Sequence, residues 1–262
     1  REALDRKVQG LATSDGVRLQ ASSTVSHAGI KSGDVLTAVV GARAWEGAAD
    51  AQPIVIDNGT GFSRVGFAGD DQPQIIFPSI VGRPEGVMLP TTMKDCYVGH
   101  EVEHVHDLRR QCPFTRGVVT NWDDMERIWH HSFYSELSVA PEKHPVLLTE
   151  PPFNPKATRE RVCQIMFEVF NVPKLYLSLG AALSLFHSGH TTGVVLSSGE
   201  SATYVEPIYE GFPLTFSIKR VDVGGNHITE YLTGLLSETC RAAVPDIASA
   251  AQIIKETLCS VP

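Results

Sequence analysis

The sequence predicts an α/β protein from residue 53 onward, on three observations. Strand-like and helix-like segments alternate along this part of the chain, which is typical of α/β architectures. Two apolar runs end in similar glycine-containing turns, DNGTG at 57–61 and SSGES at 197–201, each followed by a second β-rich run. Between them, apolar residues recur at helical spacing in MERIWHHSFYSEL at 125–137 and ATRERVCQIMFEVFN at 157–171.

Each predicted element follows from its own pattern. The run at 54–69, IVIDNGTGFSRVGFAG, is an apolar strand, a turn that contains Asn-Gly and a second strand, which is the signature of a β-hairpin. The run at 192–211, TGVVLSSGESATYVEPIYEG, repeats this order around a Ser-Gly turn. A third helix is predicted at 228–240, after the Gly-Gly-Asn of 224–226. Two similar hairpins far apart in the chain predict two related halves that face one cleft.

Residues 1–50 differ in composition from the rest of the chain. Ala, Gly, Ser and Val dominate, and the small residues of GARAWEGAADAQP at 41–53 predict a linker. The stretch HAGIKSGDVLTAVVG at 27–41 resembles a segment of PDZ domains, but the peptide-binding strand and groove helix of that family are not found here. We interpret residues 1–50 as a PDZ-like remnant and linker. A scaffold that binds a partner's C-terminus is one alternative function.

Length, composition and charge bound the class of protein. The 262 residues are 42% hydrophobic and 20% charged, enough for a buried core and one or two domains. The net charge of −8 and the lack of Lys/Arg-rich runs argue against nucleic-acid partners and a polybasic membrane patch. No apolar run approaches the roughly 18 residues that span a bilayer, and the N-terminal stretch lacks the apolar core of a signal peptide. Five scattered cysteines without a C-x-x-C pair indicate reduced thiols. A cytoplasmic protein without nucleic-acid or membrane partners is expected.

Residues 100–104, HEVEH, match the H-E-x-x-H pattern of zinc peptidases. On a helix, His100 and His104 lie one turn apart on one face, with a glutamate between them as general base. A catalytic zinc also needs a third protein ligand, and no second His/Glu motif supplies one. The segment is therefore predicted to be a short polar surface helix that starts after Gly99 and ends by Pro113, and no zinc is expected.

The turn of the first hairpin suits a phosphate. Asn58, Gly59, Thr60 and Gly61 form a tight turn whose consecutive backbone N–H groups can surround phosphate oxygens. Asp57, at the end of the strand, can hold the waters of a Mg²⁺ ion that bridges those phosphates. An Asn-Gly pair between strands is also a simple turn former, so the motif alone leaves both interpretations open.

Longer runs carry a family resemblance. DNGTG, GFAGDD, FPSIVGRP, VTNWDDMERIWHHSFYSEL, APEKHPVLLTEPPFNPKATRER, QIMFEVFN and PIYEGF resemble actin in the family's order and nearly its spacing, over residues 53–262. The resemblance implies an α/β, actin-like fold: two ribonuclease-H-like halves with ATP and a divalent cation in the cleft between them, truncated here in the second half. It also implies that HEVEH is an ordinary polar helix of an outer subdomain.

The resemblance implies a set of nucleotide-binding residues. They are Asp57, Asn58, Gly59, Thr60, Gly61, Arg64, Gly199, Glu200, Gly225, Lys255 and Glu256. Arg64 stands where the family has a phosphate-contacting lysine, which keeps the charge but replaces a point charge with a planar fork. Glu200 replaces an aspartate of the second phosphate loop. The implied cofactor is ATP or ADP with Mg²⁺, held by Asp57 through water.

Three departures from the family fall on its hydrolytic positions. Ser197 stands where actin has an aspartate that orients metal-bound waters, Gly180 where it has the glutamine that positions the attacking water, and Tyr204 where it has a nearby histidine. ATP hydrolysis depends on positioning that water and on stabilising charge around phosphate and metal. We therefore predict no meaningful ATPase activity. Arg116, at the place of a histidine that senses phosphate release, is a further departure.

The resemblance also implies a division into subdomains. Residues 53–78 and 113–187 correspond to the first, 79–112 to the second, and 188–262 to parts of the third and fourth. The match stops at KETLCSVP, partway through the fourth subdomain, so we expect sheet and helix faces that are covered in actin to lie open.

The expected function is that of a divergent, cytoskeletal actin-family protein with a degenerate ATP cleft. Actin-family subunits and actin-binding proteins are the expected partners. The loop EGVMLPTTMKD at 85–95, with Met88 and Met93, and the hairpin at 207–215, with Phe212, correspond to polymerisation contacts of actin. The competing interpretations are an active actin-type ATPase that polymerises and the PDZ-like scaffold.

Overall fold

The computed structural model describes residues 51–84, 94–239 and 247–260, together with three short strands nearer the N-terminus. Those strands, β1 (Leu11–Ala12), β2 (Arg18–Leu19) and β3 (Thr37–Ala38), pair antiparallel in the order β2-β1-β3. The rest of the PDZ-like segment and linker, and most of the 85–95 loop, lie outside the described residues.

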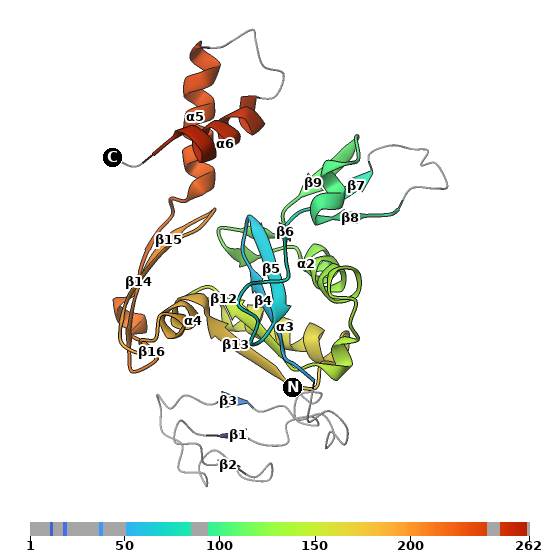
Figure 1. Cartoon of the computed structure of the whole chain (residues 1–262), viewed down its shortest axis with the longest axis vertical. Coiled ribbons are helices and arrows are strands. Elements are labelled where there is room, and N and C mark those ends of the chain that lie inside the picture. The colour runs from blue at the N-terminus through green and yellow to red at the C-terminus, as the bar shows by residue number, and fades with distance from the viewer. Residues whose placement is uncertain are drawn as a thin grey trace.

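A mixed five-stranded sheet forms the centre of the molecule (Figure 1). Its strands are β4 (Ile54–Asn58), β5 (Phe62–Phe67), β6 (Ile75–Pro78), β12 (Val146–Glu150) and β13 (Leu175–Leu179), in the order β13-β12-β4-β5-β6. β12 runs parallel to β4 and β13, whereas β4, β5 and β6 are antiparallel. The first predicted hairpin is thus confirmed as β4 and β5. The mixture of parallel and antiparallel pairs confirms the α/β class.

Two predicted helices supply apolar side chains to the main core. α2 (Trp122–His130) continues as a π-helix over His131–Glu136, and α3 is Lys156–Glu168. Asn121 caps α2 by accepting the amide of Asp124 at 3.2 Å. The core joins residues of the central sheet to these helices: Ile54, Ile56, Val65, Leu148, Met125, Ile128, Trp129, Phe133, Ile165 and Met166. The two helical predictions are confirmed.

A second sheet carries the second predicted hairpin. β14 (Gly193–Ser198), β15 (Thr203–Tyr209) and β16 (Phe212–Pro213) follow one another, and β17 (Lys219–Val221) pairs with β15. α4 (Gly180–His187) packs on its inner face through Ala181, Ala182 and Leu185, which contact Ile208. This small core is separate from the main one.

The outer face of β14 and β15 is apolar and exposed. Val194 and Leu196 are 67% and 69% exposed, and the antiparallel register places them opposite Pro207 and Val205. Scattered exposed apolar residues are normal, but neighbours on one sheet face form a patch. These neighbours therefore form an exposed apolar patch on the second sheet.

Smaller elements surround the two sheets. β7 (Val81–Pro84), β8 (Tyr97–Val98) and β9 (Leu108–Gln111) form a three-stranded sheet, β10 (Phe114–Thr115) pairs with β11 (Val118–Val119), and short 3₁₀ helices span Gly99–Glu103, Pro141–Lys143 and Thr215–Ser217. α5 (Gly225–Thr239) and α6 (Ile247–Leu258) stand together at the same end of the molecule as the β7–β9 sheet (Figure 1). The helix predicted at 228–240 is thus part of α5. Within the described part of the chain, no helix is long and apolar enough to cross a membrane.

The helix predicted from Gly99 to Pro113 is wrong in its length. Only a 3₁₀ helix forms at Gly99–Glu103, Asp107 then adopts a positive φ of 60°, and the chain continues as β9 because it pairs with β7. In a 3₁₀ helix residues three apart are aligned, so the two histidines four apart do not share a face.

The side chains of the HEVEH segment have other partners. A ring nitrogen of His100 lies 3.1 Å from the carbonyl oxygen of Ile76, and Glu101 forms an ion pair with Lys94 at 2.7 Å. Among the described residues, no group of three His, Cys, Asp or Glu side chains is arranged to hold a metal ion.

Candidate functional site

The first hairpin ends in a turn that requires glycine. The amide of Gly59 donates to the carbonyl of Phe62 at 3.0 Å and closes the turn. A Cβ at Gly59 would lie 2.8 Å from that carbonyl oxygen, too close for any side chain. The amides of Thr60 and Gly61 donate to no backbone carbonyl in the described part of the chain. These two N–H groups are free to bind an anion.

The second hairpin closes in the same way. The amide of Gly199 donates to the carbonyl of Ala202 at 2.9 Å, and the amides of Glu200 and Ser201 donate to no backbone carbonyl of the described residues. The two turns face each other, because the hydroxyl oxygens of Thr60 and Ser201 are 3.1 Å apart. Two loops of the same construction, 141 residues apart in the chain, therefore meet.

The two turns line a cavity of about 740 Å³, which is within the usual range of small-molecule sites. Nine of the eleven predicted nucleotide-binding residues are in its wall: Asp57, Asn58, Gly59, Thr60, Gly61, Arg64, Gly199, Glu200 and Gly225. The three substituted hydrolytic positions, Gly180, Ser197 and Tyr204, line it as well. The structure thus brings these residues to one place, and their role as nucleotide ligands stays a prediction.

The other two predicted residues are not part of the cavity wall. Lys255 on α6 donates from Nζ to the carbonyl of Gly225 at 3.1 Å and to the Thr229 hydroxyl at 2.8 Å. It therefore holds α6 against the first turn of α5. Glu256 is exposed and accepts a hydrogen bond from Gln252 at 3.2 Å.

Asp57 is fixed from two sides at the end of β4. The Thr149 hydroxyl donates to its Oδ1 at 2.6 Å, and Nη1 of Arg64 lies 3.4 Å from its Oδ2. A carboxylate has about four acceptor positions, so Asp57 keeps capacity for the waters of a cation. Arg64 already forms an ion pair with the Asp57 carboxylate. Its guanidinium also adds positive charge to the wall of the cavity.

Sequence reasoning missed Glu206 in β15. This side chain is 2% exposed and lines the cavity. The Ser197 hydroxyl lies 3.4 Å from its Oε1, and its Oε2 has no hydrogen-bond partner among the described residues. Burial raises the pKa of Glu206 above its ordinary value, and the hydrogen bond from Ser197 opposes this to a smaller extent. The alternating run YVEPIY at 204–209 contained a signal for this residue. In a strand, Glu206 shares a face with Tyr204 and Ile208, so a charged residue stands at a position expected to be buried.

Tyr204 is also buried in the cavity wall. Its hydroxyl has no hydrogen-bond partner in the described part of the chain, and burial raises its pKa while the nearby Arg220 lowers it. The guanidinium of Arg220 lies 5.5 Å from the Tyr204 ring centroid and donates to the carbonyl of Arg116 at 2.8 Å. Arg116, whose φ is 51°, therefore contacts this group through its backbone.

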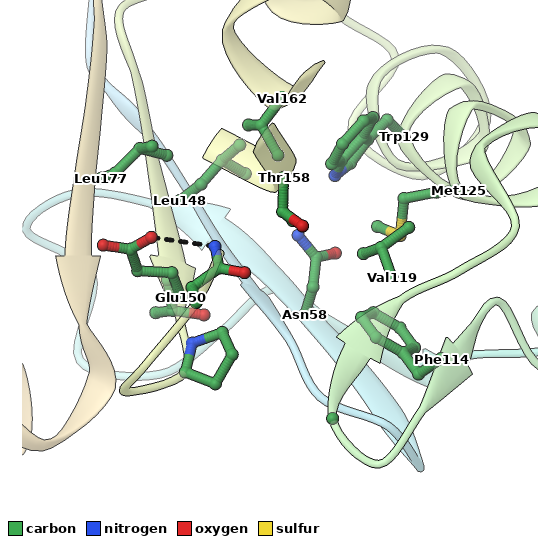
Figure 2. Close-up of a pocket in the computed structure, with 14 residues that line it drawn as sticks. Asn58, Phe114, Val119, Met125, Trp129, Leu148, Glu150, Thr158, Val162 and Leu177 are labelled. Carbon is green, nitrogen blue, oxygen red and sulfur yellow. Dashed lines mark hydrogen bonds between the residues drawn. The ribbon is translucent and has the colours of Figure 1, made fainter. Parts of the chain in front are cut away.

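A second, smaller cavity is lined by residues of β4, β12, α2 and α3 (Figure 2). It has a volume of about 40 Å³. Three polar atoms in its wall have no hydrogen-bond partner within residues 51–84, 94–239 and 247–260: Oδ1 of Asn58, Oδ1 of Asn154 and Nε1 of Trp129. Figure 2 shows the indole nitrogen of Trp129 on the side that faces Asn58. Asn154 is fixed by donating to Glu150 at 3.0 Å, the dashed line in Figure 2. A polar cavity of this size suits ordered water.

His130, at the end of α2, and His131, at the start of the π-helix, both pack against aromatic rings. His131 is buried, lies 2.8 Å from Glu136 Oε1 and packs edge-on against the Phe77 ring. His130 packs against the Tyr134 ring, with centroids 4.6 Å apart.

Comparisons with known proteins agree with the geometry. The model of the family described as Actin matches residues 48–257. An "Actin-like protein" of Neurospora crassa is 49% identical over 191 residues, which cover 71% of this chain and 50% of that protein. The chain thus spans about half the length of this curated relative. The resemblance of residues 1–50 to a PDZ domain finds no support in these comparisons.

Proposed function

This chain belongs to the actin family, and from that premise we propose that it is a divergent structural protein that binds ATP or ADP in its cleft without hydrolysing ATP. The observation that supports binding is the meeting of the two glycine turns at one cavity. Their four free amides point to a ligand rich in oxygen and negative charge. The volume of about 740 Å³ accommodates a nucleotide.

The cavity wall also offers oxygen groups for a hydrated divalent cation. Among the described residues no three acidic side chains are arranged to ligate a metal directly, so the wall carboxylates Asp57 and Glu206 would hold the cation through its waters, several of which Mg²⁺ usually keeps. When bound, Mg²⁺ neutralises charge on the phosphates. Asp57, which Thr149 orients, holds the cation through water.

The proposed absence of hydrolysis rests on the side chains at the three substituted positions. Gly180 has no side chain, and no described residue beyond its own helix turn and chain neighbours has an atom within 4 Å of where its Cβ would be. Ser197 hydrogen-bonds Glu206 instead of presenting a charge of its own. The Tyr204 phenol has a raised pKa and so does not serve as a base at neutral pH. No group at these three positions orients and deprotonates an attacking water.

One observation favours the alternative of an active ATPase. Glu206 places a carboxylate beside Ser197, where the family has its aspartate. A measurement of phosphate release from ATP separates the two proposals: turnover at the rate of an actin would refute the inactive cleft.

For partners and location, we propose actin-family subunits or actin-binding proteins in the cytoplasmic cytoskeleton. Phe212, in β16 and 64% exposed, is available for contact with another subunit. The proposal rests on family membership together with this exposed aromatic residue.

Thermal unfolding of the whole chain with and without Mg·ATP tests the binding proposal. A ligand that binds only the folded state at 100 times its Kd stabilises it by about 2.7 kcal/mol. We expect a higher Tm with Mg·ATP and a smaller rise in Asp57→Asn. Asp71→Asn, an exposed carboxylate outside the cavity wall, is the matched control and should respond like the wild type. An unchanged Tm in the wild type would refute nucleotide binding.

A further inference from the structure

Glu206 occupies a position that the strand geometry reserves for a buried side chain. Along β15, buried Tyr204, Glu206 and Ile208 alternate with less buried residues. The first and last of these are apolar or aromatic, as expected for the inner face of a sheet. A carboxyl group at the middle position is kept from water without a basic partner, since no ion pair of the described residues includes Glu206.

The hydrogen bonds of Glu206 leave it incompletely satisfied. Its contact with the Ser197 hydroxyl is long, at 3.4 Å, compared with about 2.7–2.8 Å for an ordinary O–H···O bond. Its second oxygen has no hydrogen-bond partner in the part of the chain that the structure describes. Buried polar atoms in folded proteins nearly always have a partner, so an unpaired carboxylate oxygen in a cavity wall indicates a further partner inside the cavity, an ordered water or a ligand.

The place of Glu206 identifies the ligand's chemistry. Glu206 and Asp57 line one cavity from opposite hairpins. Ser197, the substituted position of the second hairpin, is the residue that Glu206 contacts. Strand β15 thus places the carboxyl group of Glu206 beside Ser197. Ser197 is the position at which the family has an aspartate.

We propose that Glu206 is a cation-positioning residue which, together with Asp57, holds the hydrated divalent cation in the cleft and so replaces the carboxyl group missing at Ser197. The inference rests on the proposed nucleotide-binding function and adds to it a residue that the resemblance does not supply. A bound cation offsets the buried charge. This gives a physical reason for an unpaired carboxylate at this position.

The test is a titration of the full chain with Mn²⁺, followed by the electron paramagnetic resonance signal of the free ion, with and without ATP. Glu206→Gln keeps the shape and removes the charge. We expect it to weaken Mn²⁺ binding about 10–100-fold, the usual effect of removing a residue that supports a metal site. Cation-free ATP binding, measured by thermal shift in EDTA, should be unchanged. Glu160→Gln, on the exposed surface of α3, is the matched control.

A charge relocation distinguishes a cation role from a structural one. The double variant Ser197→Asp with Glu206→Val moves the carboxyl group back to β14. We expect it to recover Mn²⁺ affinity to within a few-fold of the wild type, which a packing role for Glu206 does not predict.

A measurement on the wild type avoids dependence on the folding of variants. Mn²⁺ should broaden the carboxyl ¹³C resonances of both Asp57 and Glu206. Broadening at Asp57 without broadening at Glu206 would overturn the inference, as would Mn²⁺ binding that is absent or unaffected by Glu206→Gln. Failure of the proposed function has a different signature: the wild type would then bind no ATP in any buffer, while the Mn²⁺ titration without ATP would still decide the role of Glu206.

Discussion

Replacing Glu206 with glutamine should stabilise the protein at neutral pH when no divalent cation is present. The side chain is 2% exposed. Among the described residues, one carboxylate oxygen has no hydrogen-bond partner and the other has one long contact. An ionised group in such a place costs several kcal/mol, whereas an imperfectly paired neutral amide costs about 1–3 kcal/mol. The difference predicts a gain of about 1–3 kcal/mol in the free energy of unfolding.

The pH dependence of this gain has a definite sign. Burial raises the pKa of Glu206 in the folded state above its ordinary value of 4.5. Between these two pKa values the folded state binds more protons than the unfolded state, so wild-type stability falls as pH rises through the interval. Below the unfolded pKa both states are protonated, and the penalty is absent. Glutamine does not titrate, so the two stability curves should converge at low pH and separate above about pH 4.5.

Urea unfolding in EDTA at a series of pH values measures this difference. For a chain of this size each kcal/mol corresponds to about 2–4 °C in Tm, which gives an independent reading. Glu160→Gln should leave the curve unchanged, because its carboxylate is exposed. Parallel wild-type and Glu206→Gln curves across the whole range would refute the reasoning, since they would show that Glu206 does not change protonation between the folded and unfolded states.

Three other substitutions test the structure. Gly59→Ala places a Cβ 2.8 Å from the Phe62 carbonyl and should abolish the Mg·ATP-dependent rise in Tm; an undiminished rise would contradict the tight turn. Asp124 is 0% exposed and forms an ion pair with Arg83. Arg83→Met removes the cationic partner of this buried charge, so urea unfolding should show a free energy of unfolding that is lower by about 3–5 kcal/mol. Trp129→Phe removes the indole donor at the small cavity and should cost about 1–3 kcal/mol in the same assay; a neutral effect would argue against ordered water there.

Local sequence patterns predicted the hairpins and helices well because their causes are local. Glycine turns and alternating apolar residues specify the two hairpins, and apolar spacing specifies α2, α3 and α5. The segment at 99–113 was predicted wrongly because its outcome depends on a distant strand. β9 forms by pairing with β7, and no pattern within the segment records that partner.

The sequence by itself determined which residues form the two glycine turns, since short-range glycine chemistry decides each of them. Only the tertiary structure decided that the turns meet, with Thr60 and Ser201 in hydrogen-bond contact, and that one cavity collects residues from both sheets. The tertiary structure also decided the environment of Glu206. In the sequence this residue is one more glutamate, but the register of β14 and β15 buries it beside Ser197. Burial and pairing are properties of distant contacts, so the chemistry of this carboxyl group could be inferred only after the fold was known.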